Sequence, residues 1–300
     1  MKTAMILAAG FGTRLRPYSE IRPKPLFPVM GRPLIQRTIQ QLRKAGFTRI
    51  IINVHYLGEK ICHIVEEPGI IMQRERIELG TGGGLRLAME KLGQGPALIT
   101  NGDIYHRCDY QRIYRQHCTS SAPITMVMHD YPRFNKVLVK DGRVISFSPG
   151  LSPTARSDNS GSLAAFTGIQ VIEPAILRHI IPSIFTNIID YYEEYLAGGG
   201  EINALNVDDF WRDIGTPTDY LALHGRLLKE EAPGAGWQPL NNQGFYRAKD
   251  AVIGRNLVCL DWGIIGSGAR IGDDVSLERV VVWDGANIPA GTTARDKIIT

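Results

Sequence analysis

Short apolar runs alternate with amphipathic segments in the first half of the chain. Residues 4–9 form an apolar run that ends at Gly10, which indicates a buried strand leading into a loop. Residues 33–45 repeat apolar side chains at helical spacing until Gly46 ends the pattern. Further apolar runs predict strands at residues 49–54, 97–100, 124–129 and 136–147. This alternation predicts an α/β fold with a Rossmann-like mixed, mainly parallel sheet flanked by helices.

A different period governs the C-terminal part. Apolar side chains recur there every six residues, with small or apolar residues between them. The repeating positions are Ile253, Cys259, Ile265, Ile271, Leu277 and Trp283. A six-residue period is typical of a parallel β-helix. We expect a short left-handed β-helix whose phase breaks near Ile288-Pro289; a small antiparallel β appendage is the alternative.

The composition changes between these two patterns and gives the domain boundaries. Residues 229–246 are rich in Glu, Pro and Gly, which is typical of a linker. We therefore predict a first domain over residues 1–228, a linker over 229–246 and a C-terminal domain over 247–300. Residues 148–162, rich in Ser, Pro, Gly and Asn, predict a mobile loop of the kind that borders active sites.

Charge and composition exclude several classes of protein. The net charge of +4 suits anionic small-molecule substrates, and the basic residues are too dispersed for a nucleic-acid surface. No apolar run is long enough to span a membrane, and the N-terminal run is too short for a signal peptide. The cysteines form no CxxC pair, which predicts reduced thiols at Cys62, Cys108, Cys118 and Cys259. We expect a cytoplasmic protein without a nucleic-acid or membrane partner.

The strongest chemical signal lies directly after the first predicted strand. Residues 7–14 form a glycine-rich loop, which lets backbone N–H groups approach a phosphate. The loop has no Gly-Lys-Ser/Thr ending, and the second strand ends at Asn53 rather than at an acid, so it fits neither a P-loop nor a dinucleotide fingerprint. Lys24 follows between Pro23 and Pro25, which fix the backbone on either side of it. A lone lysine is usually just solvated, but beside an arginine-bearing glycine loop a phosphate contact is favoured.

Two aspartates are candidate magnesium ligands. Asp103 follows a predicted strand, at the edge of a parallel sheet where ligands gather. Asp213 precedes Ile214-Gly215. Mg²⁺ prefers one or two carboxylates together with phosphate oxygens and water. A turn or capping role is the structural alternative for each aspartate.

Together these motifs resemble the sugar-1-phosphate nucleotidylyltransferases. That family opens with a glycine loop ending in Thr-Arg-Leu, followed by Pro-Lys-Pro, and this chain carries both. Four later segments resemble its base-recognition loop, first metal-binding strand end, sugar-contacting segment and second metal-binding segment: residues 79–84, 100–103, 166–169 and 211–217. The resemblance implies a Mg²⁺-dependent enzyme that joins a nucleoside triphosphate to a sugar-1-phosphate and releases pyrophosphate. A C-terminal left-handed β-helix is also common in the family.

The resemblance also implies roles for individual residues. Arg14, Lys24, Asp103 and Asp213 are expected to be catalytic, with the two aspartates as the metal ligands. Gly168 and Thr216 are expected to contact the sugar phosphate. The expected nucleotide-binding residues are Leu7, Ala8, Ala9, Gly10, Gly12, Thr13, Arg14, Lys24, Gln73, Thr81, Gly82, Gly83, Asn101 and Gly102. The expected reaction is direct in-line attack of the sugar phosphate on the α-phosphorus.

The chain departs from the family at residues 144–149. Many members hold the sugar phosphate with a Glu-Lys-Pro lysine, which is absent here; the candidates to replace it are Lys136, Lys140, Arg143 and Arg156. The same lack occurs in relatives that use UTP and N-acetylmuramate-1-phosphate. Heptose-1-phosphate guanylyltransferases share the Leu-Gly-Thr-Gly-Gly run, and mannose-1-phosphate guanylyltransferases often carry the β-helix. The base, U or G, and the sugar therefore stay open.

Two other functions are weaker alternatives. A non-catalytic regulatory subunit that binds a nucleotide sugar would be expected to lose Arg14, Lys24 or a metal aspartate, and all are present. A hexapeptide acyltransferase usually needs a catalytic histidine, and residues 247–300 contain none. The C-terminal repeats are better interpreted as a brace or as the interface of a homo-oligomer.

Two histidines and three tryptophans are expected to have structural rather than chemical roles. His55 and His106 lie near the predicted sheet edge and are expected to be surface or supporting residues rather than ligands. Trp237, Trp262 and Trp283 are expected to pack the linker and the β-helix.

Overall fold

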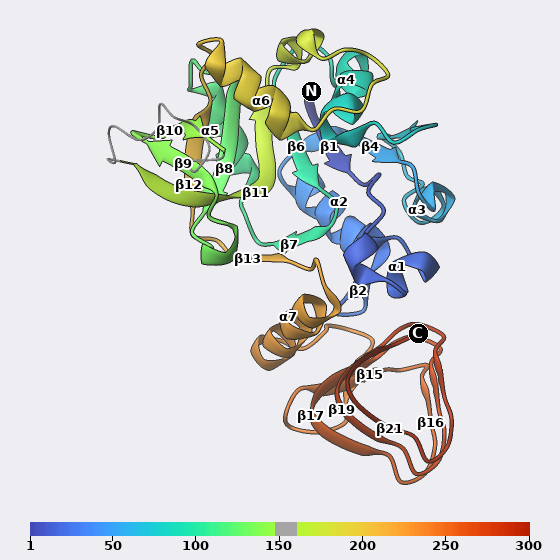
Figure 1. Ribbon diagram of the computed structural model, residues 1–300. Helices are drawn as coiled ribbons and strands as arrows, with labels where there is room; N and C mark the ends of the chain where they lie inside the picture. The colour runs from blue at the N-terminus through green and yellow to red at the C-terminus, as the bar shows by residue number, and fades with distance from the viewer. Residues whose placement is uncertain (148–160) are drawn as a thin grey trace. The chain divides into compact units, whose positions relative to one another are not determined.

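The computed structural model describes residues 1–147 and 161–300. They form two compact units, each made of two chain segments (Figure 1). The first unit contains Met1–Phe11 and Ile35–Trp211, and the second contains Gly12–Leu34 and Arg212–Thr300. Segment Gly12–Leu34 therefore groups with the C-terminal part. The predicted domain boundaries stay predictions, and almost all of the predicted loop at residues 148–162 lies outside the described residues.

The first unit is built on one mixed sheet with the strand order β5-β4-β1-β6-β11-β8-β12-β10-β9. Strands β5, β4, β1 and β6 are mutually parallel, as are β8 and β12, while β11 is antiparallel to both β6 and β8. The prediction of a mixed, mainly parallel sheet is confirmed, because seven of the nine described strands run in the same direction. The two exceptions are β11, which inserts into the middle of the sheet in the opposite direction, and β10, which is antiparallel to both of its neighbours. The strands are β1 (Lys2–Leu7), β4 (Phe47–Val54), β5 (Ile70–Arg74), β6 (Ala97–Asn101), β8 (Ile124–His129), β9 (Val137–Lys140), β10 (Arg143–Ser146), β11 (Ser162–Ile172) and β12 (Asn203–Val207).

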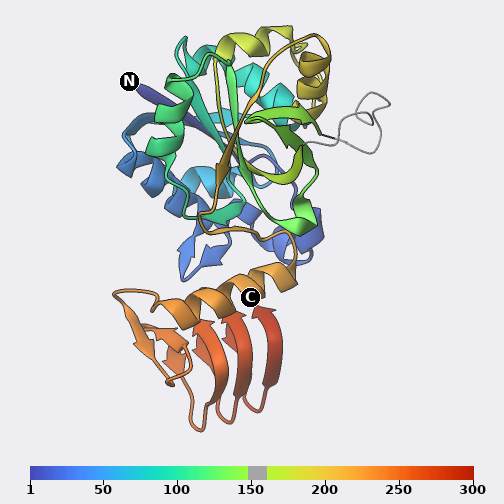
Figure 2. The same ribbon diagram turned by 90° about the vertical axis from the view of Figure 1, so that its left-hand side faces the viewer.

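Helices cover both faces of this sheet, α4 and α6 on one face and α2 and α5 on the other (Figure 2). The core strands are apolar on both sides because both faces are buried. Met5 and Ile51, for example, share a buried cluster with Leu85 of α4 and Tyr192 of α6. Helices and short elements of this unit are α2 (Leu34–Lys44), α3 (Gly58–Ile64), α4 (Gly80–Leu92), β7 (Ile104–His106), α5 (Tyr110–Cys118), η3 (Pro132–Phe134), η5 (Pro174–His179) and α6 (Ile188–Ala197). Among residues 1–147 and 161–300, none of the helices combines the length and the hydrophobicity of a membrane-spanning segment.

The second unit begins with a segment of short turns and one hairpin. Strands β2 and β3 pair antiparallel, and the turn between them includes Gly31 with a φ of 70°. The segment's elements are η1 (Thr13–Leu15), α1 (Tyr18–Ile21), η2 (Lys24–Leu26), β2 (Pro28–Val29) and β3 (Arg32–Pro33). The chain returns to this unit through β13 (Trp211–Asp213) and α7 (Pro217–Glu230).

The C-terminal residues form coils whose strands stack in parallel (Figure 1). Ile253 is aligned with Ile271, and Ile271 with Ile288, so successive coils take up about three six-residue repeats. One sheet contains β14 (Trp237–Pro239), β15 (Phe245–Ala248), β17 (Val258–Ile265), β19 (Ser276–Val282) and β21 (Thr293–Ile299). The other contains β16 (Val252–Ile253), β18 (Arg270–Ile271) and β20 (Asn287–Ile288). That the coil is left-handed stays a prediction.

The strand register corrects one detail of the six-residue pattern. The pattern aligns Ile265 with Trp283, whereas the structure pairs Ile265 with Val282. The register shifts between Leu260 and Gly263, so the phase breaks before residue 288. Val282 consequently lies in the core of the coil, and Trp283 is buried elsewhere.

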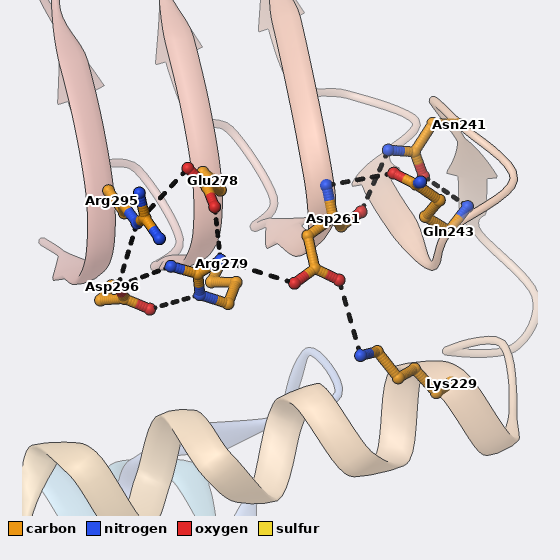
Figure 3. Close-up of polar contacts among 8 residues, drawn as sticks. All are labelled: Lys229, Asn241, Gln243, Asp261, Glu278, Arg279, Arg295 and Asp296. Atoms are coloured by element: carbon orange, nitrogen blue, oxygen red, sulfur yellow. Dashed lines mark hydrogen bonds and ion pairs between the residues drawn. The ribbon is translucent and has the colours of Figure 1, made fainter.

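Helix α7 packs along β17, β19 and β21, so the coil is covered by its own unit (Figure 2). Near the end of α7, Lys229 Nζ lies 3.6 Å from Asp261 Oδ1 (Figure 3). Asp261 Oδ2 also lies 3.6 Å from Arg279 Nη1. Arg279 forms a second ion pair with Asp296 of the next coil. This series of ion pairs connects α7 to successive coils at the surface.

Candidate active site

The glycine loop and the turn that carries Asp103 leave the same edge of the sheet. Leu7 at the end of β1 is paired in register with Asn101 at the end of β6. The Gly102 N–H donates a 2.8 Å hydrogen bond to the Leu7 carbonyl. A Cβ at Gly102 would lie only 2.9 Å from Ile6 Cγ2, so this turn needs a glycine. The parallel β1–β6 pairing therefore gathers the predicted residues at one carboxyl edge.

The segment expected to contact the sugar reaches this edge too. Ile169 of β11 is paired with Thr100 of β6. Gly168 has a φ of 79°, and a Cβ there would lie 2.6 Å from Asn101 Nδ2. The Thr167 hydroxyl donates to the Val127 carbonyl at 2.8 Å, which fixes the strand beside the glycine. Gly168 thus makes room for the Asn101 side chain.

Two buried side chains that the sequence analysis did not select support the glycine loop. Asn53 Oδ1 accepts a 2.9 Å hydrogen bond from the Ala8 N–H, and Asn53 Nδ2 donates to Glu75 Oε1 at 2.8 Å. Burial raises the pKa of Glu75, although hydrogen bonds from Asn53 and Gln73 oppose this. One signal for this role is present in the sequence: Asn53 lies at the end of the second predicted strand, where a dinucleotide fold would have an acid.

The glycines of the predicted base-recognition loop have a structural use within the first unit. The N–H groups of Gly82 and Gly83 donate to the Thr186 carbonyl, at 2.8 and 3.3 Å. A Cβ at Gly83 would lie 2.8 Å from the Ile184 carbonyl oxygen, and one at Gly84 would lie 2.7 Å from Glu75 Oε1. The run of glycines therefore allows close approach by other parts of the chain.

Gln73 and Thr81, two other expected nucleotide ligands, also make contacts within the protein. Buried Gln73 donates through Nε2 to the Gly84 carbonyl at 2.9 Å and accepts from Lys91 at 3.3 Å. The Thr81 hydroxyl accepts the Ile188 N–H at 3.0 Å. The nucleotide contacts of these side chains, like those of Gly82 and Gly83, stay predictions.

Three of the four expected catalytic side chains lie together in the second unit. Gly12, with a φ of 63°, precedes the short 3-10 turn that carries Arg14. Lys24 Nζ lies 3.3 Å from Asp213 Oδ1, and Arg14 Nη2 lies 3.9 Å from Asp213 Oδ2. The Lys24 side chain is only 6% exposed, whereas that of Arg14 is 63% exposed. The fourth residue, Asp103, belongs to the first unit.

Gly215 is a further residue that sequence reasoning missed. A Cβ at this position would lie 2.5 Å from Asp213 Oδ2 and 3.0 Å from Arg14 Nη2. Only glycine lets these two side chains take their observed places. The next residue, Thr216, caps α7: its hydroxyl accepts the Asp219 N–H at 3.1 Å and donates to Asp219 Oδ2 at 2.7 Å. Its expected sugar-phosphate contact stays a prediction.

A magnesium ion that arrives with phosphate needs few ligands from the protein. Within residues 1–147 and 161–300, no cluster of three or more His, Cys, Asp or Glu side chains could hold a metal by itself. Mg²⁺ does not need such a cage, because it is usually bound by one or two carboxylates, substrate phosphates and water. Asp103 belongs to the first unit and Asp213 to the second, and their role as metal ligands stays a prediction.

His106 is a buried structural residue beside the Asp103 turn, as expected. Its Nδ1 accepts the Cys108 N–H at 3.2 Å, and its Nε2 lies 2.8 Å from the Tyr110 hydroxyl, which donates to Thr100 at 3.1 Å. Burial lowers the pKa of His106 to about 4. His55 contacts the Glu75 carbonyl through Nδ1 at 2.9 Å.

The replacement for the missing family lysine is still open. Arg143 forms an exposed ion pair with Glu201, at 2.5 Å. The Lys136 backbone N–H donates to the Ala164 carbonyl, which places Lys136 beside β11. Lys140 ends strand β9. Arg156 lies outside the described residues.

Comparison with known proteins decides the family. The sequence profile of the nucleotidyl transferase family matches residues 3–230. The chain belongs to this family. The resemblance to nucleotidylyltransferases and the predicted enzyme class are therefore confirmed.

Relatives of this nucleotidyl transferase carry two kinds of name. A mannose-1-phosphate guanylyltransferase from Mycobacterium tuberculosis is 25% identical, over 96% of this chain and 81% of its own. An N-acetylmuramate alpha-1-phosphate uridylyltransferase from Caulobacter vibrioides is 28% identical, over 76% of this chain and 98% of its own. Among solved structures, HddC from Yersinia pseudotuberculosis has a TM-score of 0.61 at 22% identity and matches 75% of this chain and 99% of its own, which supports the fold.

Proposed function

We propose that this nucleotidyl transferase is a sugar-1-phosphate nucleotidylyltransferase, which converts a nucleoside triphosphate and a sugar-1-phosphate into a nucleotide sugar and pyrophosphate. The observation that carries the proposal is the cluster of Arg14, Lys24 and Asp213, which joins both of the chain's phosphate-type motifs in one unit. The names of relatives from Mycobacterium tuberculosis, Danio rerio and Caulobacter vibrioides point to the same reaction class. A non-catalytic regulatory subunit of the same fold is the alternative.

The chemistry needs positioning and charge neutralisation more than covalent help from the protein. An oxygen of the sugar phosphate attacks the α-phosphorus, the bond to the β-phosphate oxygen breaks, and pyrophosphate leaves. The attacking phosphate is already ionised, so no general base is required. In this proposal Lys24 holds phosphate oxygens at the reacting centre, and Arg14 neutralises charge on the departing pyrophosphate.

Magnesium completes the proposed site. Asp103 and Asp213 are the residues that would hold it. When bound, Mg²⁺ supplies Lewis-acid stabilisation of charge on the phosphate oxygens. The glycine loop, with Leu7, Ala8, Gly10 and Thr13, binds the nucleotide phosphates through its backbone in this proposal.

GTP and mannose-1-phosphate are the first substrates proposed. Relatives named mannose-1-phosphate guanylyltransferase match 91–97% of this chain, so they share its C-terminal part. UTP and N-acetylmuramate-1-phosphate are the second pair. They are favoured by the uridylyltransferase relative, whose own length is 98% covered, and by the missing Glu-Lys-Pro lysine. A heptose-1-phosphate is a third sugar to include.

The C-terminal part has its own proposed features. We propose that the stacked coils form a left-handed β-helix domain over residues 247–300, joined by a linker at 229–246 to the catalytic residues 1–228. A homo-oligomer through this domain and a cytoplasmic location are also proposed. Light scattering of the full chain tests the oligomer, since a monomer at all concentrations would remove it.

Pyrophosphate release tests the function. Purified protein with Mg²⁺ is assayed with UTP, GTP, CTP, ATP and dTTP, each against mannose-, N-acetylmuramate-, heptose- and glucose-1-phosphate. Release that needs one nucleotide and one sugar phosphate together supports the proposal and identifies both substrates. Tight binding of a nucleotide sugar, with no release from any pair, would favour the regulatory-subunit alternative.

A further inference from the structure

The residues on both sides of the lysine motif contact one tryptophan of the C-terminal coils, Trp283. Pro23-Lys24-Pro25-Leu26 is flanked by Arg22 and Phe27. The Arg22 guanidinium lies 4.7 Å from the centre of the Trp283 ring, and the Phe27 ring packs edge-on against Trp283 at 4.8 Å. Trp283 is itself buried, at 2% exposure. Because of the register shift between Leu260 and Gly263, Val282 rather than Trp283 lies in the interior of the coil.

Hydrogen bonds continue from Trp283 into the same segment. Trp283 Nε1–H donates to the Tyr220 hydroxyl at 3.2 Å, and the Tyr220 hydroxyl donates to the Pro28 carbonyl. Tyr220 also packs against Phe27, with ring centres 5.6 Å apart. These groups are buried, so each bond replaces one that water would otherwise make.

Two further contacts tie the segment to the coil and to α7. Arg22 Nη1 lies 3.7 Å from Asp284 Oδ2, next to Trp283 in the sequence. The Met30 N–H donates to His224 Nε2 at 3.3 Å, and His224 Nδ1 lies 3.0 Å from the Tyr220 carbonyl. Because that carbonyl can only accept and the Met30 N–H can only donate, Nδ1 of His224 carries a proton and Nε2 accepts.

The tip of the β2–β3 hairpin is covered by the first strand of the coils. A Cβ at Gly31 would lie 1.9 Å from the Trp237 ring. Gly31 also has a φ of 70°, which side-chain-bearing residues rarely adopt. The close contact with Trp237 therefore depends on this glycine.

The path from these contacts to the Lys24 ammonium is short. The Phe27 N–H donates to the Lys24 carbonyl at 3.0 Å, closing a single 3-10 turn. Lys24 is also buried and held by Asp213. A shift of Arg22 and Phe27 would thus move Lys24 directly.

We propose that Trp283, with Asp284, is a positioning residue for Lys24: the C-terminal coil fixes segment Gly12–Leu34 and thereby the direction of the lysine. The consequence for turnover rests on the function proposed above, while the mechanical part does not. The coil is then a part of the phosphate site's framework rather than only an oligomer interface.

Amide hydrogen exchange tests the mechanical part without any substrate. The N–H groups to follow are those of Phe27, Met30 and Leu34, which are bonded to Lys24, His224 and Phe27. In full-length Trp283→Leu we expect their exchange to speed up by about tenfold or more, while strand β1 stays protected. Trp283→Phe retains an aromatic face for Arg22 and Phe27 and is expected to restore most of the protection.

A matched pair of charge variants avoids the risk that the tryptophan variants misfold. Asp284→Asn removes the partner of Arg22 but keeps the Oδ1 acceptor used by the Ser267 N–H. Asp273→Asn likewise removes the partner of Arg255 and keeps the acceptor for its N–H. Only Asp284→Asn is expected to speed up exchange in segment Gly12–Leu34.

Kinetics tests the catalytic consequence. Asp284→Asn and Trp283→Phe are expected to lower kcat for pyrophosphate release several-fold and Trp283→Leu about 10²-fold, with little change in KM for the sugar phosphate, because a displacement near 1 Å costs about this much. Asp273→Asn should keep the wild-type kcat. Equal exchange at Phe27 and Met30 in all variants would overturn the proposal, whether or not the wild type is active. Faster exchange with unchanged kcat in an active enzyme would overturn the link to catalysis alone.

Discussion

Asp213 lies between a buried lysine and an exposed arginine, and this arrangement has a physical reason. A buried ammonium without an anion nearby is costly. Asp213 Oδ1, 3.3 Å from Lys24 Nζ, supplies that anion before any phosphate arrives. The Arg14 side chain is 63% exposed, so a substrate can reach it from solvent. The same carboxylate thus orients the lysine in the free protein and is the proposed metal ligand in the reacting complex.

Replacing Lys24 tests its proposed contact with the reacting phosphate. We expect Lys24→Met to lower kcat/KM for pyrophosphate release by about 10²–10³, as loss of one electrostatic donor does elsewhere. Lys44→Met, at the exposed end of α2, is the control and should be nearly neutral. Steady-state kinetics measures both variants. A Lys24→Met enzyme with wild-type kinetics would remove this residue from the mechanism.

Gly215 offers a second test at the level of a single residue. In Gly215→Ala the new methyl group would lie 2.5 Å from Asp213 Oδ2, so the carboxylate must move away. We expect kcat/KM to fall about tenfold or more through this misplacement. Gly95→Ala is the matched control, because a Cβ at Gly95 meets no atom within 4 Å. Equal activity of the two alanine variants would contradict the assignment.

At the scale of elements, β6, β7 and α5 are joined by one buried polar chain. It runs from the Cys108 N–H through His106 and Tyr110 to the Thr100 hydroxyl. Thr100 immediately precedes Asn101-Gly102-Asp103, so the chain fixes the strand end from which Asp103 projects. Such a chain stabilises only while His106 is neutral, since a protonated Nδ1 cannot accept the Cys108 N–H.

The buried hydrogen-bond chain through His106 predicts how the stability of the protein depends on pH. Burial lowers the pKa of His106 from 6.5 to about 4, so at pH values between these two the unfolded state binds a proton that the folded state does not. The free energy of unfolding should therefore fall as the pH drops from about 6.5 to about 4, by roughly 3 kcal/mol from this group. Urea unfolding of the wild type and of His106→Gln across this range measures the difference. Parallel pH profiles for the two proteins would refute it.

At the scale of the whole molecule, the two compact units cut across the order of the sequence. Segment Gly12–Leu34 begins within the glycine loop and belongs to the same unit as α7 and the coils. Phe27 of this segment packs against Tyr220 of α7 and Trp283 of the coils. The C-terminal part therefore completes the second unit's core, as a repeat stack needs a neighbour to bury its surface.

Removing the coils tests this organisation. A chain that ends at Gly236 loses Trp283 and Trp237, which cover Phe27 and Gly31. We expect a loss of stability of at least about 3–5 kcal/mol, comparable to deleting one large buried aromatic side chain. Thermal unfolding and yield of soluble protein measure it. If the shortened chain were as stable as the full chain, the coils would be an independent attachment.

The sequence by itself determined much of this protein. The strands at residues 4–9, 49–54 and 124–129 and the helix at 33–45 were predictable because local periodicity reports which faces are buried. The family followed from short motifs, since phosphate chemistry demands particular residues at close spacing. The six-residue repeat likewise predicted the parallel coils.

Tertiary structure decided what local pattern does not encode. Asn53 and Glu75 beneath the glycine loop, Gly215 beside Arg14, and Trp283 beside Lys24 act through partners distant in the chain. The antiparallel direction of β11 and the one-residue register shift between Leu260 and Gly263 also depend on pairing between separate strands. A side chain's periodicity gives the face on which it lies, whereas its partner is fixed only when the chain folds back on itself.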